Sequence, residues 1–187
     1  MEIFIILGLI LLNGVFSMSE IAIISSRRAR LEIDAKNGNK PARTALRLAE
    51  NPDRFLSTIQ IGITLIGILT GLFSGEMLAG YVAVWIAHIE PLAPYSLGIA
   101  QTLIVILVTY LTLIFGELVP KRIGLSVSES AAKLIAPVMD FLSRVASPFV
   151  WVLSASTSAV SRMLGLRDRK DDVVTEEEVK AVVAQSA

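Results

Sequence analysis

Glu117 is an ionisable side chain at the end of a long uncharged stretch, and Pro120 follows it in the segment LIFGELVPKRIGL (113–125). Proline has no N–H, so the carbonyl of Gly116, four residues earlier, loses its helical partner. Irregular backbone at membrane depth is tolerated mainly where it lines a cavity or a bound ion. A carboxylate beside a free carbonyl is an all-oxygen set that suits hard cations such as Mg²⁺, Ca²⁺ or Na⁺. The segment therefore predicts a cation site.

Three apolar segments each carry one stripe of polar or small residues at helical spacing. Polar side chains inside a membrane usually face inward and often mark pathways, so we expect the stripes to meet. The stripes are Asn13, Ser17 and Glu20; Gln60, Thr64, Gly67 and Gly71; and Thr109, Thr112 and Gly116, with Glu117 beside the last.

Simpler explanations stay open for part of this pattern. Stripes of Gly and Thr commonly serve helix packing, which we favour for Gly67, Gly71 and the two threonines of the third stripe. Glu20 could reach the membrane surface or pair with a cytosolic Arg or with Lys121. Gln60 could bridge two helices, and Lys121 could simply anchor the end of its segment.

The residue types exclude several other kinds of chemistry. There is no Cys, so disulfides and thiolate sites are excluded, and the single histidine, His88, argues against zinc or copper. Ser17 and Ser19 have no His in reach on their own segment, and no paired carboxylates or HExxH spacing occur. We therefore expect no enzymatic activity.

The elements that must position these residues are membrane helices. Of the 187 residues, 53% are hydrophobic, and no Lys or Arg occurs in 1–26 or in 55–120. Spans at about 3–24, 55–73 and 97–119 are each close to the ~20 residues that cross a bilayer. The basic stretch 27–54 faces the cytoplasm by the positive-inside rule, which places the N-terminus outside and the C-terminus inside. We predict an all-α membrane protein with three transmembrane helices.

The remaining segments surround these spans. We expect 1–125 to form the transmembrane domain, with a cytosolic helical hairpin at 27–52. The stretch 77–89 is predicted to be re-entrant or interfacial, with a fourth span as the alternative. Charges recur through 126–166, which favours a belt of cytoplasmic-side juxtamembrane amphipathic helices. Residues 167–187 are read as a linker and the start of a truncated acidic helical bundle, where Thr175 and Glu178 fit a capping box.

Three motifs in order resemble the transmembrane domain of the CorC / cyclin M (CNNM) family of magnesium transporters. They are FSMSEIAI (16–23), NPDRFLSTIQIGITL (51–65) and FGELVPK (115–121), and the resemblance covers essentially the whole chain. It implies a homodimer in a bacterial-type inner membrane that exports Mg²⁺, with coupling to Na⁺ proposed for some members. Full-length relatives continue into paired CBS modules that bind adenine nucleotide, so we expect no nucleotide site in this sequence and no nucleic-acid partner.

The resemblance also assigns residues. Ser17 and Glu117 match the family's cation-binding positions, with the Gly116 carbonyl adjacent. Thr64 and Gly67 stand where some members carry asparagine, which weakens ligation from the second span. The expected metal ligands are Ser17, Gly116, Glu117, Thr64 and Gln60, and the expected supporting residues are Asn13, Ser19, Glu20, Gly67 and Pro120. The alternative function is a Mg²⁺-sensing regulatory or scaffolding subunit without transport of its own.

Overall fold

The computed structural model describes residues 2–165, which are helical throughout apart from short connections and contain no strand. Three stretches are long and apolar enough to cross a membrane: Ile3–Ser25, Pro52–Phe73 and Glu90–Ser126. This agrees with the predicted fold class. Large apolar side chains such as Phe4, Leu11 and Ile106 are exposed on these stretches, as expected for helices that face lipid.

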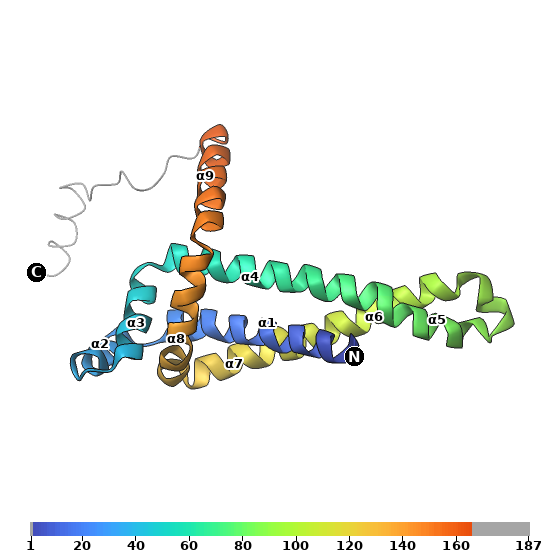
Figure 1. Ribbon diagram of the computed structural model, residues 1–187, viewed down its shortest axis with the longest axis horizontal. Helices are drawn as coiled ribbons and strands as arrows, with labels where there is room; N and C mark the ends of the chain where they lie inside the picture. Colours follow the sequence, from blue (N-terminus) through green and yellow to red (C-terminus); the bar gives the residue numbers. More distant parts are fainter. Residues whose placement is uncertain (1, 166–187) are drawn as a thin grey trace, which may run out of the picture. The chain divides into compact units, whose positions relative to one another are not determined.

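The first span is α1 (Glu2–Ser25), and it lies between the second span and the end of the third span (Figure 1). It packs against the second span, α4 (Pro52–Phe73), and against the end of the third span. Phe16 of α1 fills the place where a side chain on Gly62 of α4 would stand, since a Cβ there would come within 2.3 Å of its ring. This close packing fixes which face of α4 points toward α1.

The basic stretch between the first two spans folds into two short helices, α2 (Arg28–Lys36) and α3 (Lys40–Glu50). They are separated by Gly38, whose φ of 88° is in the left-handed region, and by Asn39, whose side chain caps α3. Lys133 of α8 (Ser128–Val145) lies 2.7 Å from Asp34 and ties this hairpin to the rest of the membrane unit.

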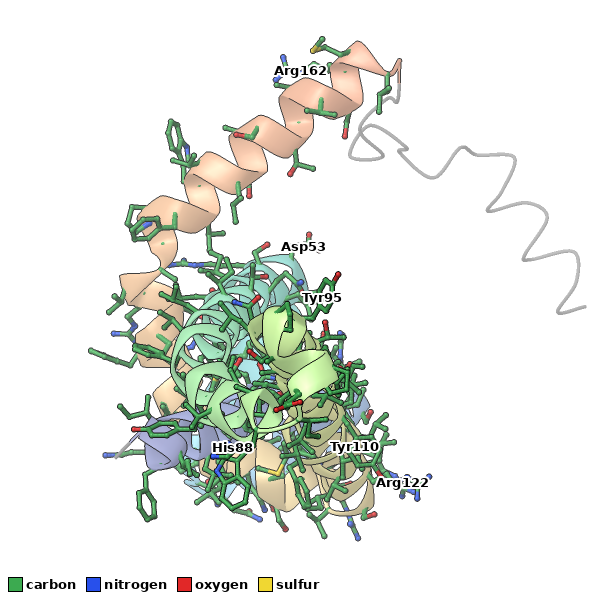
Figure 2. The ribbon with its side chains drawn as sticks, turned by 90° about the vertical axis from the view of Figure 1, so that its right-hand side faces the viewer. Asp53, His88, Tyr95, Tyr110, Arg122 and Arg162 are labelled. Atoms are coloured by element: carbon green, nitrogen blue, oxygen red, sulfur yellow. The ribbon has the colours of Figure 1, made fainter. Side chains whose placement is uncertain are left out.

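The second span does not end in a separate fourth crossing. A π-helical turn, η1 (Ser74–Leu78), continues α4 into α5 (Ala79–Ala87), which has nine residues and is too short to span. The chain returns through the 3₁₀ turn η2 (Glu90–Tyr95) into α6 (Ser96–Leu113), which packs against α5. Figure 2 looks onto this end, where the labelled His88 and Tyr95 lie. His88 is exposed, with Nδ1 2.8 Å from the carbonyl of Val84.

The third span is longer than predicted. Where the sequence suggested an end at Pro120, the helix continues from α6 through a second π-helical turn, η3 (Ile114–Leu118), into α7 (Val119–Ser126). The physical reason is that a π turn already lacks the regular α-helical hydrogen bonds, so a proline just beyond it removes little.

The helices after the third span are α8 and α9 (Ser147–Met163). One compact unit runs from Met1 to Ala146, and within it α8 packs against α1 and α3. By length and composition, α8 and α9 together also pass as a broken span, giving three or up to four crossings. The predicted linker and bundle at 167–187 lie outside the described residues.

Candidate cation site

The π turn η3 places Gly116 against the first span. Pro120 cannot donate a hydrogen bond, and the N–H of Val119 reaches back five residues to the carbonyl of Ile114. Gly116 is buried, and a Cβ on it would stand 3.2 Å from the Asn13 amide nitrogen and 3.3 Å from the Ile10 carbonyl. Glycine therefore allows the two backbones to approach closely at this point.

The carbonyl of Gly116 accepts two side-chain hydrogen bonds from α1. Asn13 Nδ2 donates to it at 3.0 Å and Ser17 Oγ at 2.9 Å. Both donors are buried, with 7% and 1% of their surface exposed, and they lie one helical turn apart. The polar stripe of the first span thus meets the carbonyl of Gly116.

Two buried oxygens beside this turn have no hydrogen-bond partner among residues 2–165. They are Asn13 Oδ1 and Thr112 Oγ1, and the methyl group of Thr112 lies 3.4 Å from the position of a Cβ on Gly116. An unpaired buried acceptor costs about 1–3 kcal/mol of folding free energy. Such oxygens are suited to accept a hydrogen bond or to contact a positive charge.

Glu117 is part of this turn, but its carboxylate is held by a lysine. Glu117 Oε1 lies 2.9 Å from Lys121 Nζ, and Glu20 Oε2 of α1 lies 3.8 Å from the same ammonium group. The Glu117 side chain is 43% exposed, so it is not enclosed in the core. The structure thus bears out the pairing of Glu20 with Lys121 that the sequence left open. It also shows that any metal ion must compete with Lys121 for Glu117.

Gln60, Thr64 and Ser19 make no hydrogen bond with the Gly116 carbonyl, and Gly67 lies on the exposed side of α4. Gln60, Thr64 and Gly67 are exposed on α4, and a Cβ on Gly67 would meet no atom within 4 Å. Because Phe16 packs onto Gly62, the polar stripe of α4 faces away from Ser17. Ser19 is fully buried and donates to the Val15 carbonyl of its own helix.

A cavity of about 200 Å³ lies between α4 and α6 and extends to Leu113, the residue before the turn η3. Thr112 lines it, as do Gly67 and Gly71, so the second and third stripes meet here. Thr70 and Ser74 also line the cavity and were not singled out from the sequence; their hydroxyls bond to carbonyls of their own helix. Their positions three and seven residues after Gly67 were the available signal.

These features define a polytopic α-helical membrane domain whose third span is interrupted at a buried, oxygen-rich turn with two acidic side chains nearby. The profile of the cyclin M transmembrane N-terminal domain (CNNM) matches residues 4–187, and the chain belongs to this family. The predicted family resemblance is confirmed.

Similar curated proteins occur in several bacteria. The chain is 47% identical to a UPF0053 protein of Synechocystis. The match covers all 187 residues of this chain and 42% of the length of that relative. It is 32% identical to the polyamine export protein of Escherichia coli K12, covering all of this chain and 41% of the relative. For the polyamine export protein of Haemophilus influenzae the identity is 31%, over 97% of this chain and 42% of the relative. The chain therefore spans about two fifths of the length of these relatives.

Proposed function

We propose that this chain is the membrane domain of a cation exporter and that Mg²⁺ is the exported ion, with Na⁺ as a candidate coupling ion. The observation that carries this proposal is the Gly116 carbonyl, which lies against Ser17 and Asn13 and directly precedes the acidic residue Glu117 in the chain. We place the domain in an inner membrane with its N-terminus outside, because the basic stretch 27–54 favours the cytoplasmic side.

The proposed ligands are oxygens of three kinds: the Ser17 hydroxyl, the Glu117 carboxylate and the Gly116 carbonyl, which must release its hydrogen bond from Asn13 to bind an ion. Ser17 donates its proton to Gly116 and keeps its oxygen lone pairs for an ion. Mg²⁺ usually retains several waters and binds one or two carboxylates, so a small protein set is sufficient. Gln60 and Thr64 are left out of this set because they face outward on α4.

Lys121 competes with a cation for the Glu117 carboxylate. For Glu117 to ligate an ion, its carboxylate must leave the ammonium group 2.9 Å away. Glu20 lies 3.8 Å from that ammonium and can hold it when Glu117 is released. We propose that this exchange between two acids lowers the electrostatic cost of loading and unloading the site, with Pro120 keeping the Gly116 carbonyl free of a helical partner.

A second candidate substrate is a polyamine. Relatives in Escherichia coli and Haemophilus influenzae bear the name polyamine export protein. The structure offers an independent observation: Glu20 and Glu117 already hold an alkylammonium, that of Lys121. The amino group of a polyamine has the same charge and the same hydrogen-bond donors.

We also propose a homodimer. Gln60 and Thr64 expose polar groups on the membrane face of α4, where lipid cannot hydrogen-bond to them. A second copy packed on this face would cover them. Since the chain has no Cys, a single Thr64→Cys substitution should give oxidative dimers, whereas Leu11→Cys on the exposed side of α1 should not. Equal cross-linking of both variants would contradict this interface.

The deciding experiment is transport by the full-length protein in liposomes, with Mg²⁺ and putrescine tested separately. Glu117→Gln should abolish flux of the true substrate, and Glu50→Gln, which neutralises an exposed acid of α3, should not. Flux of putrescine alone would favour the second substrate. Mg²⁺ binding without any flux would assign the chain the sensing or scaffolding role, and wild-type flux in Glu117→Gln would remove Glu117 from the mechanism.

A further inference from the structure

A second polar cavity lies at the start of α4, outside the candidate cation site. It has a volume of about 310 Å³ and is bounded by α3, the first turn of α4 and α8. Arg47, Arg54 and Arg144 line it together with Asp140 and Ser143. All five residues lie in the compact unit 1–146, and three helices contribute to the cavity.

The charges of this cavity do not balance. Asp140 is the single acid among its lining residues, and it pairs with two of the three arginines: Arg47 at 3.5 Å and Arg144 in the next turn of α8. Arg54 instead donates to the backbone carbonyl of Ser143 at 3.4 Å. Three guanidinium groups against one carboxylate leave two net positive charges, which favours an anion that accepts several hydrogen bonds.

The cavity also contains an unpaired hydroxyl. Ser143 is 5% exposed, and its Oγ has no hydrogen-bond partner within the described part of the chain. Asn51, at the start of the 22-residue helix α4, lines the cavity too and makes no side-chain cap bond. The positive end of that helix dipole therefore adds to the arginine charges, while the acidic Asp53 of its first turn is exposed and not part of the lining.

The outer face of α8 indicates what kind of anion approaches. Leu134, Val138 and Phe141 recur on one helical face and are more than half exposed, while the opposite face packs in the core. A helix with a bare apolar face beside arginines is typical of a membrane surface. The basic stretch that contains Arg47 and Arg54 also marks the cytoplasmic side of the bilayer.

We propose that this cavity binds the phosphate group of an anionic phospholipid at the cytoplasmic membrane surface. Arg54 and Arg144 hold the phosphate, Ser143 donates its free hydroxyl, and the lipid chains lie along the apolar face of α8. A lipid bound here joins α3, α4 and α8 and so fixes the hairpin against the second span.

The test uses the full-length protein in neutral detergent and native mass spectrometry. It compares phosphatidylglycerol, phosphatidylcholine and glycerol phosphate as probes. Arg54→Gln combined with Arg144→Gln should weaken phosphatidylglycerol binding about tenfold or more, since both substitutions remove charge-assisted hydrogen bonds. The matched double variant Arg43→Gln with Arg122→Gln removes equal charge at exposed sites outside the cavity and should stay within about twofold of wild type.

A conservative variant distinguishes a loss of lipid binding from a loss of folding. Ser143→Ala keeps every charge and should reduce phosphatidylglycerol binding about fivefold through the loss of one hydrogen bond to an anion. The melting temperature of each variant without lipid checks its folding.

Three results would overturn the proposal: equal losses in the matched control, equal affinity for phosphatidylcholine, or unchanged binding in both cavity variants. Displacement of phosphatidylglycerol by glycerol phosphate at equal concentration, with the same dependence on Ser143, would assign the cavity to a soluble phosphate ester and overturn the lipid as its source.

Discussion

Lys121 Nζ lies 2.9 Å from Glu117 Oε1, one helical turn earlier, and 3.8 Å from Glu20 Oε2 on the first span. Two acids that lie in segments expected to cross a membrane therefore share a single ammonium group, which leaves one net negative charge. Without it, both carboxylates would repel each other in a medium of low polarity. The ammonium group thus lowers the electrostatic cost of holding two acids here.

Replacing Lys121 by Met should make the protein depend on an added cation. The variant leaves Glu20 and Glu117 without their shared partner, so the melting temperature should fall, and added Mg²⁺ or putrescine should raise it more than in wild type because a bound ligand stabilises by mass action. Thermal unfolding in detergent measures both effects. Arg122→Gln is the control, because Arg122 is exposed and its side chain points outward at the edge of the molecule (Figure 2). Equal cation shifts in wild type and Lys121→Met would contradict the exchange mechanism.

Asn13 and Ser17 should act as a coupled pair. Each donates to the same carbonyl, so Asn13→Ala and Ser17→Ala should each cost about 1 kcal/mol of unfolding free energy. The double variant should deviate from additivity by about 0.5 kcal/mol or more because the two donors share an acceptor. A double-mutant cycle from reversible unfolding measures this, with Thr102→Ala, an exposed hydroxyl of α6, as the reference. Strict additivity would show that the two bonds are independent.

Gly14 lies in a closely packed contact, whereas Gly67 faces open space. A Cβ on Gly14 would stand 2.8 Å from the Phe115 carbonyl and 2.9 Å from Pro120 Cγ, whereas a Cβ on Gly67 would meet nothing within 4 Å. Gly14→Ala should destabilise by about 1–3 kcal/mol because the backbone must shift. Gly67→Ala should be neutral or stabilising by up to about 1 kcal/mol, since alanine favours the helix. Chemical denaturation measures the unfolding free energy of both variants. A larger loss for Gly67→Ala than for Gly14→Ala would contradict the close contact of Gly14 with the third span.

Pro120→Ala should restore a helical hydrogen bond to the Gly116 carbonyl and weaken cation binding at the candidate site. Alanine supplies an N–H that can donate to the Gly116 carbonyl, which competes with Asn13 and Ser17 for that oxygen. Amide hydrogen exchange should show stronger protection across 114–121, and cation flux in liposomes should fall. Wild-type exchange and flux together would mean that the proline does not set the state of this carbonyl.

Much of the fold could be read from charge alone. The absence of Lys and Arg from two long stretches defined the spans, because a bilayer excludes those residues. The contact between the first and third spans also followed from local chemistry, since Pro120 frees the Gly116 carbonyl and Asn13 and Ser17 share one face. These inferences needed no knowledge of how the helices are rotated.

The orientation of the second span could not be read in this way. Its polar stripe was expected to face Ser17, but the Phe16–Gly62 contact turns Gln60 and Thr64 outward. Such packing depends on the shapes of two helices together, which a single stripe does not encode. The arginine cavity was missed for a similar reason: Arg47 and Arg54 indicated topology, and their joint position with Ser143 arises only when α8 folds back.

The five-residue turn at Ile114–Leu118 has a geometric consequence for everything after it. A turn of this type holds one residue more than its α-helical equivalent, and each residue advances a helix by about 100°. Deleting one residue there would restore regular winding with little change in the angular position of Lys121, whereas deleting one residue from a regular turn of α6 would rotate Lys121 by about 100° around the axis. The turn thus accommodates one additional residue while the third span still presents its lysine to the first.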